Sequence, residues 1–263
     1  MPVTEVNGIN ICYEDEGGDP PLVFLHCWTG NKAFFFEQVK RFSRGYRCIA
    51  VDFPGHGGSN ECDEYTVEHF TEIIVGLMKK LKVKKAVFVG HSMGGMVCMQ
   101  LALDHPGLVK GIILLDTTSH LSGYLFQRAV ASVAVLVSPL GIKPARAVVA
   151  GIAATYPFAG LKARIITGRE CCKVPNRVTG KSLNSFRNFN VTERLGEIKV
   201  PALIVVGTAD LLADVRHART LARGLPNSTM RVVHGAGHMA LFEKPEVVNE
   251  AMEGYLDRVY PSK

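Results

Sequence analysis

The sequence has no long hydrophobic run, no internal repeat and no low-complexity segment. Its most apolar stretch, Ala129 to Val137, is ended by Ser138-Pro139, whereas a membrane-spanning helix needs roughly 20 apolar residues. Met1 to Glu14 alternates polar and apolar residues and lacks the basic and apolar regions of a secretory signal. We therefore predict no transmembrane segment and expect a protein that is not secreted.

The seven cysteines also lack the spacing of a metal or redox site. Their number is odd, most lie in apolar runs, and they form neither a C-x-x-C pair nor a Cys/His cluster with zinc spacing. We interpret them as reduced thiols, predict a cytoplasmic location and expect no bound metal. These residues are Cys12, Cys27, Cys48, Cys62, Cys98, Cys171 and Cys172.

The basic residues do not form a nucleic-acid-binding motif, although the formal net charge is +6. The one dense cluster lies at the end of a predicted helix, where lysines interact favourably with the negative end of the helix dipole. No aromatic residues are interleaved with it. We interpret the cluster as a solvated helix end and expect no nucleic-acid partner. Its members are Lys79, Lys80, Lys82, Lys84 and Lys85.

The sequence does contain the pattern of a mostly parallel β-sheet. Val3 to Glu14 alternates around Asn7-Gly8, which predicts an antiparallel hairpin. Short continuous apolar runs follow at helix-length intervals, as in parallel strands that are buried on both faces. The predicted parallel strands are Leu22 to Leu25, Cys48 to Val51, Ala86 to Val89, Gly111 to Leu115, Pro201 to Val206 and Thr229 to Val233.

Helices are predicted between these strands, and one segment interrupts the alternation. After Thr66, a predicted N-cap, apolar residues recur every three or four positions, which predicts an amphipathic helix. Further helices are expected at about 214–225 and 245–260. Residues 119–195 are predicted to form several short helices, because proline and glycine interrupt their apolar patches. We predict an α/β fold with helices on both faces of the sheet. Its core would comprise residues 1–118 and 196–263, with 119–195 as a helical lid insertion.

The third parallel strand runs directly into Gly90-His91-Ser92-Met93-Gly94-Gly95, and helix-forming residues follow. A G-x-S-x-G turn between a strand and a helix is typical of a nucleophile elbow, because the glycines permit the tight backbone that exposes the serine. A packing turn is the alternative interpretation. The context favours Ser92 as a catalytic nucleophile.

A serine nucleophile needs a histidine base and an acid that orients the histidine. Asp210 and His238 follow the last two predicted strands, at the sheet edge where open α/β folds bind ligands. Asp116, after the fourth parallel strand, is an alternative acid, and we favour Asp210. We interpret the other histidines of glycine-rich turns as structural rather than metal ligands. These are His26, His56, His91 and His234.

With these motifs in place the chain resembles the α/β-hydrolase fold family, and is similar to its small lid-bearing serine hydrolases such as bacterial aryl esterases, cofactor-free haloperoxidases and enol-lactonases. The matching segments are Leu25-His26-Cys27-Trp28, Asp52 to Ser59, the elbow at Ser92, and the regions of Asp210 and His238. The resemblance implies a Ser92, Asp210, His238 triad that acts without a cofactor.

The resemblance also implies an oxyanion hole formed by the backbone N–H groups of Trp28 and Met93. Here the sequence departs from the family pattern, because Cys27 stands where the family usually has glycine. A Cβ restricts the backbone angles, so the loop either takes a conformation that an L-residue tolerates or shifts. We favour the interpretation of Cys27 as a small buried residue.

The resemblance and the apolar lid together predict the substrate class. We expect a small-molecule carboxylic ester with an apolar acyl or aryl group. A lactonase, thioesterase, carbon–carbon bond hydrolase or perhydrolase would use the same triad, and a slow-turnover small-molecule receptor is an alternative of another class. The sequence leaves the natural substrate and the oligomeric state open. The predicted pocket residues are Cys27, Leu121, Tyr124, Leu125 and Phe126.

Overall fold

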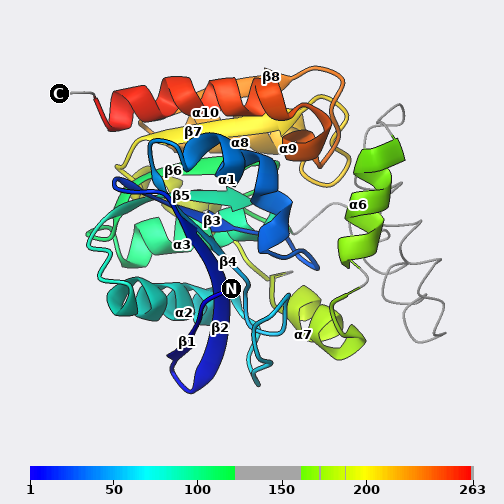
Figure 1. Ribbon diagram of the computed structural model, residues 1–263. Coiled ribbons are helices and arrows are strands. Elements are labelled where there is room, and N and C mark those ends of the chain that lie inside the picture. The colour runs from blue at the N-terminus through cyan, green and yellow to red at the C-terminus, as the bar shows by residue number, and fades with distance from the viewer. Residues whose placement is uncertain (122–160, 172, 187, 262–263) are drawn as a thin grey trace.

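A single eight-stranded sheet in the order β1-β2-β4-β3-β5-β6-β7-β8 forms the centre of the molecule (Figure 1). The computed structural model describes residues 1–121, 161–171, 173–186 and 188–261. From β3 to β8 all neighbouring strands are parallel, which confirms the predicted fold class. The strands are β1 (Val3–Val6), β2 (Ile9–Glu16), β3 (Pro21–Leu25), β4 (Arg47–Val51), β5 (Ala86–His91), β6 (Val109–Leu115), β7 (Ala202–Gly207) and β8 (Ser228–Val233).

The predicted N-terminal hairpin is present. Strands β1 and β2 pair antiparallel, and the turn between them places Asn7 at φ 50° and Gly8 at φ 78°. Positive φ at both central residues is what a tight two-residue hairpin requires. Strand β2 also pairs antiparallel with β4, and so joins the hairpin to the parallel part of the sheet.

Alternate side chains of the parallel strands enter two different hydrophobic cores. In β3, Val23 and Leu25 belong to one core, whereas Leu22 and Phe24 belong to the other. Every residue of β5 and of β7 is buried, as the continuous apolar runs predict. Strand β7 begins at Ala202, one residue after the predicted start at Pro201.

Helices cover both faces of the sheet (Figure 1). Side chains of α2 (Val67–Lys80), α3 (Met93–Asp104) and α8 (Val215–Gly224) enter the first core, and those of α1 (Phe36–Phe42) and α10 (Pro245–Val259) enter the second. The Thr66 hydroxyl accepts a hydrogen bond from His69 N at 3.0 Å, which confirms the predicted N-cap of α2. The short elements η1 (Lys32–Phe35), η2 (Thr192–Glu197) and α9 (Ala240–Glu243) were not predicted.

The described part of the predicted lid contains α6 (Leu161–Cys171) and α7 (Asn176–Phe186). Figure 1 shows both helices beside the body of the molecule, and their side chains contact the loop that follows β3. The predicted pocket residues Tyr124, Leu125 and Phe126 lie outside the described residues. Among the helices that the structure describes, none has the length and hydrophobicity to cross a membrane.

Candidate active site

Ser92 occupies the sharp turn between β5 and α3. Its backbone angles are φ 52° and ψ −115°, a positive-φ conformation that L-residues rarely adopt and that costs about 1 to 3 kcal/mol. Side chains are excluded on both sides of the turn. A Cβ on Gly90 would overlap the backbone of Gly94, and one on Gly94 would overlap the carbonyl oxygen of Leu25. The glycines of the motif are therefore required by close packing.

Hydrogen bonds from β6 and the loop after it hold this strained turn. The N–H of Ser92 donates to the carbonyl of Leu115 at 2.9 Å, and the hydroxyl of Thr117 donates to the carbonyl of Ser92 at 2.6 Å. The methyl and hydroxyl of Thr117 also fill the space against Gly95. A strained residue persists where its surroundings fix it in this way.

The structure joins Ser92, His238 and Asp210 in one hydrogen-bonded chain. The Oγ of Ser92 lies 3.0 Å from Nε2 of His238, and Nδ1 of His238 lies 2.8 Å from Oδ2 of Asp210. An ionised carboxylate only accepts hydrogen bonds, so Nδ1 carries the proton and Nε2 accepts from the serine hydroxyl. His238 and Asp210 are both buried. Three strand ends thus bring together a hydroxyl, an imidazole and a carboxylate.

The loop after β7 fixes the orientation of Asp210. Its second oxygen, Oδ1, accepts hydrogen bonds from the N–H groups of Leu212 at 2.7 Å and Ala213 at 2.9 Å. Oδ2 is thereby directed to the imidazole. Asp214 is the N-cap of α8 and accepts hydrogen bonds from the N–H groups of Arg216 and His217, as expected for a residue that begins a helix.

Asp116, the alternative acid, has different partners. Its Oδ1 accepts a hydrogen bond from Gly207 N at 2.9 Å, and its Oδ2 accepts one from Ala240 N at 3.2 Å. It thus connects the end of β7 to the start of α9, two residues after His238. Complete burial and the nearby charge of Asp210 raise the pKa of Asp116 well above its ordinary value.

Two of the remaining histidines make structural hydrogen bonds with backbone carbonyls. The Nε2 of His91 lies 2.7 Å from the carbonyl oxygen of His238, and burial together with the nearby His238 lowers the pKa of His91 to about 3. The Nδ1 of His56 lies 2.9 Å from the carbonyl of Pro54. His234 is exposed. Within the described residues, no group of three His, Cys, Asp or Glu side chains is placed to hold a metal ion.

His26 fixes the peptide bond that contains the N–H of Trp28. The carbonyl of Cys27 lies 2.8 Å from Nδ1 of His26 and accepts a hydrogen bond from Gly30 N at 3.0 Å. The Nε2 of His26 accepts from Phe53 N at 3.0 Å, so Nδ1 is the protonated nitrogen. In a trans peptide the N–H points opposite to the C=O, so the N–H of Trp28 is directed away from His26 and Gly30.

Cys27 is accommodated without backbone strain. The residues of its loop include one with positive φ, Thr29 at 62°, and Cys27 is not among the positive-φ residues. Its sulfur lies against Gly30, Cys27 belongs to the second hydrophobic core, and burial raises the pKa of its thiol well above the ordinary value. These contacts favour a packing role. Leu121 is partly buried against the first core, and the predicted substrate pocket stays a prediction.

Comparison with known proteins agrees with this architecture. A family model described as the alpha/beta hydrolase fold matches residues 20–135, and a second model, described as TAP-like protein, matches residues 163–259. The chain has the α/β-hydrolase fold.

Individual proteins resemble this chain along nearly its whole length. An uncharacterized hydrolase of Bacillus subtilis, YugF, is 26% identical and the match covers 95% of this chain and 96% of the relative. The pimeloyl-[acyl-carrier protein] methyl ester esterase of Yersinia enterocolitica is 28% identical, with 92% and 93% covered. The solved structure of Est816, described as an N-acyl homoserine lactone degrading enzyme, has a TM-score of 0.85 and 27% identity, with 96% and 99% covered.

The structure also contains a buried ion pair, between Lys32 and Asp52, that was not predicted from the sequence. The Nζ of Lys32 lies 2.6 Å from Oδ2 of Asp52, and the N–H of Lys32 donates to Oδ1 at 2.7 Å. Gly58 N also donates to Oδ2, at 2.8 Å. Asp52 is fully buried and Lys32 nearly so. The pair connects the loop after β3 to the loop after β4, and no local sequence signal marks it, because the partners are 20 positions apart.

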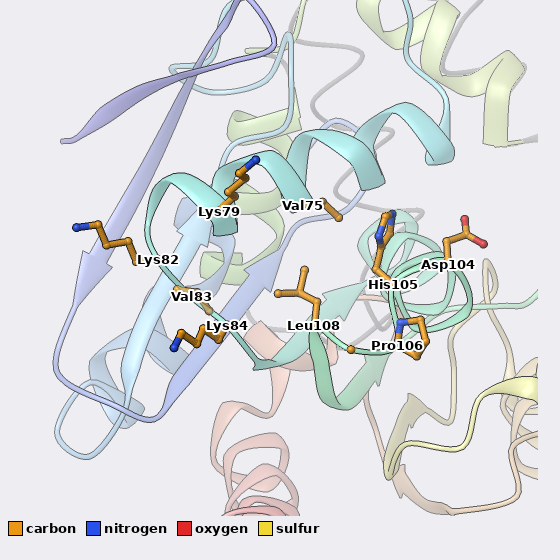
Figure 2. Close-up of a pocket in the computed structure, with 10 residues that line it drawn as sticks. Val75, Lys79, Lys82, Val83, Lys84, Asp104, His105, Pro106 and Leu108 are labelled. Carbon is orange, nitrogen blue, oxygen red and sulfur yellow. The ribbon is translucent and has the colours of Figure 1, made fainter.

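A hollow of about 750 Å³ lies near the amino ends of β5 and β6, whereas Ser92 lies at the carboxyl end of β5 (Figure 2). Its lining includes Lys84 and Leu108, which precede β5 and β6, whereas Ser92 follows β5. Three lysines of the predicted basic cluster, Lys79, Lys82 and Lys84, line the hollow, with Asp104 on its other side. At about 3.3 Å per residue the length of β5 separates this hollow from Ser92. It is therefore distinct from the candidate active site.

Proposed function

We propose that this chain is a serine hydrolase that cleaves a small-molecule carboxylic ester with an apolar acyl or aryl group through an acyl-serine intermediate. The observation that carries the proposal is the hydrogen-bonded chain from Ser92 through His238 to Asp210. The α/β-hydrolase fold supports it, as do the similar proteins named as an ester esterase and a lactone-degrading enzyme.

In the first step Ser92 attacks the ester carbonyl while Nε2 of His238 takes the hydroxyl proton. The new bond between Oγ and the carbonyl carbon gives a tetrahedral oxyanion. His238 then donates the proton to the leaving alcohol oxygen as the bond from carbon to that oxygen breaks. Asp210 stabilises the transient imidazolium and keeps its own charge. The products of this step are the free alcohol and the acyl-serine.

The backbone N–H groups of Trp28 and Met93 are proposed to bind the oxyanion. Met93 is the first residue of α3, so its N–H has no partner within the helix and lies at the positive end of the helix dipole. The N–H of Trp28 belongs to the peptide that His26 and Gly30 fix. Gly94 packs against the carbonyls of Leu25 and His26, so the two segments are in contact. Preorganised donors of this kind contribute about 3 to 4 kcal/mol each.

In the second step water hydrolyses the acyl-serine. His238 takes a proton from the water as its oxygen attacks the acyl carbon, and a second oxyanion forms in the same site. Collapse of this intermediate releases the carboxylic acid, and His238 returns the proton to Oγ of Ser92. The cycle needs no cofactor, and water is its only co-substrate.

A lactone is the second candidate substrate, and the similarity to Est816 favours it. A lactone is a cyclic ester, so the same steps open its ring and leave the alcohol attached to the acyl group. We further propose that residues 119–195 form a lid inserted between the core segments 1–118 and 196–263. The contacts of α6 and α7 with the loop after β3 support that arrangement. A cytoplasmic location is part of the same proposal.

The test is hydrolysis of p-nitrophenyl esters of graded acyl length, together with N-acyl homoserine lactones, by the wild-type protein and by Ser92→Ala and His238→Ala. Steady turnover that both substitutions abolish is the expected result. If Ser92→Ala turns over substrate as fast as the wild type, the assignment of Ser92 as the nucleophile is wrong. A single turnover followed by tight retention of the product would indicate the receptor alternative instead.

A further inference from the structure

The side chain of Trp28 connects the loop after β3 to the lid helix α7. Its indole Nε1–H is shared between two acceptors, the Oγ of Ser182 at 3.1 Å and the carbonyl oxygen of Thr179 at 3.2 Å. Trp28 is 154 positions away from Ser182 in the chain, so the contact joins two distant segments. The indole is also packed against the first hydrophobic core.

The backbone of the same residue contributes one of the two proposed oxyanion donors. The body of the protein anchors the carbonyl end of that peptide through His26 and Gly30. The Cα end of the peptide carries the indole, which α7 anchors. The direction of the Trp28 N–H therefore depends on two attachments, one in the core and one in the lid.

The Ser182 hydroxyl is oriented by α7 to accept a hydrogen bond from the indole. Ser182 is fully buried, and its hydroxyl donates to the carbonyl of Val178 at 2.7 Å. Because the hydroxyl proton points along the helix, a lone pair of the oxygen is available to the indole N–H. Without the Ser182 hydroxyl the indole would lose one of the two acceptors that the described residues provide.

A second contact ties the same loop to the other described lid helix. The Nδ2 of Asn31 donates to Oε2 of Glu170 on α6 at 2.7 Å, while Oδ1 of Asn31 accepts from Ala33 N at 3.0 Å. Burial acts to raise the pKa of Glu170, but hydrogen bonds from Lys173 and Asn31 outweigh it and hold that pKa below its ordinary value. The carboxylate therefore stays ionised as an acceptor for Asn31 near neutral pH.

We propose that Ser182 is a positioning residue for catalysis: through the indole of Trp28, helix α7 holds the oxyanion-binding N–H in its active direction. This inference rests on the proposed function, because the N–H of Trp28 matters only if an oxyanion forms at Ser92. Its consequence is that the lid takes part in transition-state stabilisation in addition to covering the substrate.

The experiment compares Ser182→Ala, Trp28→Phe and the double variant on the best p-nitrophenyl ester. Ser182→Ala is expected to lower kcat by about threefold to tenfold, the effect of one lost hydrogen bond, with KM within about twofold of the wild type. Trp28→Phe removes both indole hydrogen bonds and lowers kcat further. The double variant should match Trp28→Phe, because Ser182 acts through the indole. Lys181→Gln, an exposed change at the neighbouring position of α7, is the control and keeps the wild-type kcat.

A second readout separates positioning from a general loss of stability. A trifluoromethyl ketone forms a tetrahedral adduct with a serine nucleophile and places an oxyanion in the hole. Its affinity should fall by the same factor as kcat/KM in Ser182→Ala, while the melting temperature of the folded variant stays near that of the wild type. An unchanged inhibitor affinity would overturn the proposal.

The other outcomes are equally decisive. A folded Ser182→Ala with wild-type kcat overturns the inference, as does a double variant in which the two effects multiply. If Ser182→Ala does not fold, Trp28→Phe decides, and a wild-type kcat in that variant overturns the inference. Failure of the proposed function is seen separately, because Ser92→Ala would then turn over substrate as fast as the wild type.

Discussion

Asp116 and Asp210 follow neighbouring parallel strands, but their carboxylates face different groups. Oδ2 of Asp210 lies 2.8 Å from Nδ1 of His238, whereas both oxygens of Asp116 accept backbone N–H groups, from Gly207 and Ala240. Asp116 thereby braces the two loops that carry Asp210 and His238. Asp210 therefore contacts the imidazole, and Asp116 contacts the backbone around it.

This difference predicts opposite effects of the two Asp→Asn substitutions. Asp210→Asn should lower kcat by about 10⁴-fold with little loss of stability, because an amide cannot hold the histidine in its reactive tautomer. Asp116→Asn should keep most of the activity but lose about 1 to 3 kcal/mol of stability, because one buried N–H loses its acceptor. Steady-state kinetics and urea denaturation measure both effects, and the reverse pattern would make Asp116 the catalytic acid.

Replacing Cys27 by glycine should leave an active protein. The thiol lies against Gly30 in the second hydrophobic core, and burial keeps it protonated. We expect Cys27→Gly to fold, to keep kcat within a few-fold of the wild type, and to lose about 1 to 2 kcal/mol from lost packing and added backbone freedom. Ester hydrolysis and thermal denaturation are the measurements. A folded variant without activity would reveal a chemical role for the thiol.

His91 should make the folded state sensitive to acid. Its pKa is about 3 in the folded protein and about 6.5 when unfolded, so the unfolded chain binds more protons between these values. Stability therefore falls as the pH drops below about 6.5. His56, with its pKa lowered to about 4, acts in the same direction, while Asp116, whose pKa is raised, acts in the opposite one.

The measurement is urea denaturation of the wild type and of His91→Asn at pH 7.5 and pH 5.5. Between these values the wild type should lose about 1 kcal/mol more stability than the variant, which has no imidazole to protonate at this position. An equal loss in both proteins would show that His91 does not contribute to the acid sensitivity.

The buried pair of Lys32 and Asp52 should be essential for stability rather than for chemistry. Lys32→Met leaves a buried carboxylate without its cation and should destabilise the protein by about 3 to 5 kcal/mol. The double variant Lys32→Met/Asp52→Asn removes both charges and should recover part of that loss. Denaturation midpoints of the two variants test this, and a Lys32→Met protein as stable as the wild type would contradict it.

Features that depend only on neighbouring residues could be predicted from the sequence. The hairpin at Asn7-Gly8, the N-cap at Thr66, the start of a helix near Asp214, and the strand, turn and helix around Ser92 follow from backbone preferences and from hydrophobic periodicity. The chain order of the motifs and the apolar runs were also sufficient for the fold class. Local physical chemistry acts over a few residues, and these features need no more than that.

Contacts between groups far apart in the chain depend on how the whole chain folds. The contacts of His238 with Ser92 and Asp210 join residues 146 and 28 positions apart, and that of Trp28 with Ser182 joins residues 154 positions apart. Either Asp116 or Asp210 could serve the imidazole as far as local sequence is concerned. A hydrogen bond needs an atomic separation of about 3 Å and a defined direction. Strand order, loop conformation and packing of the whole chain set both quantities together.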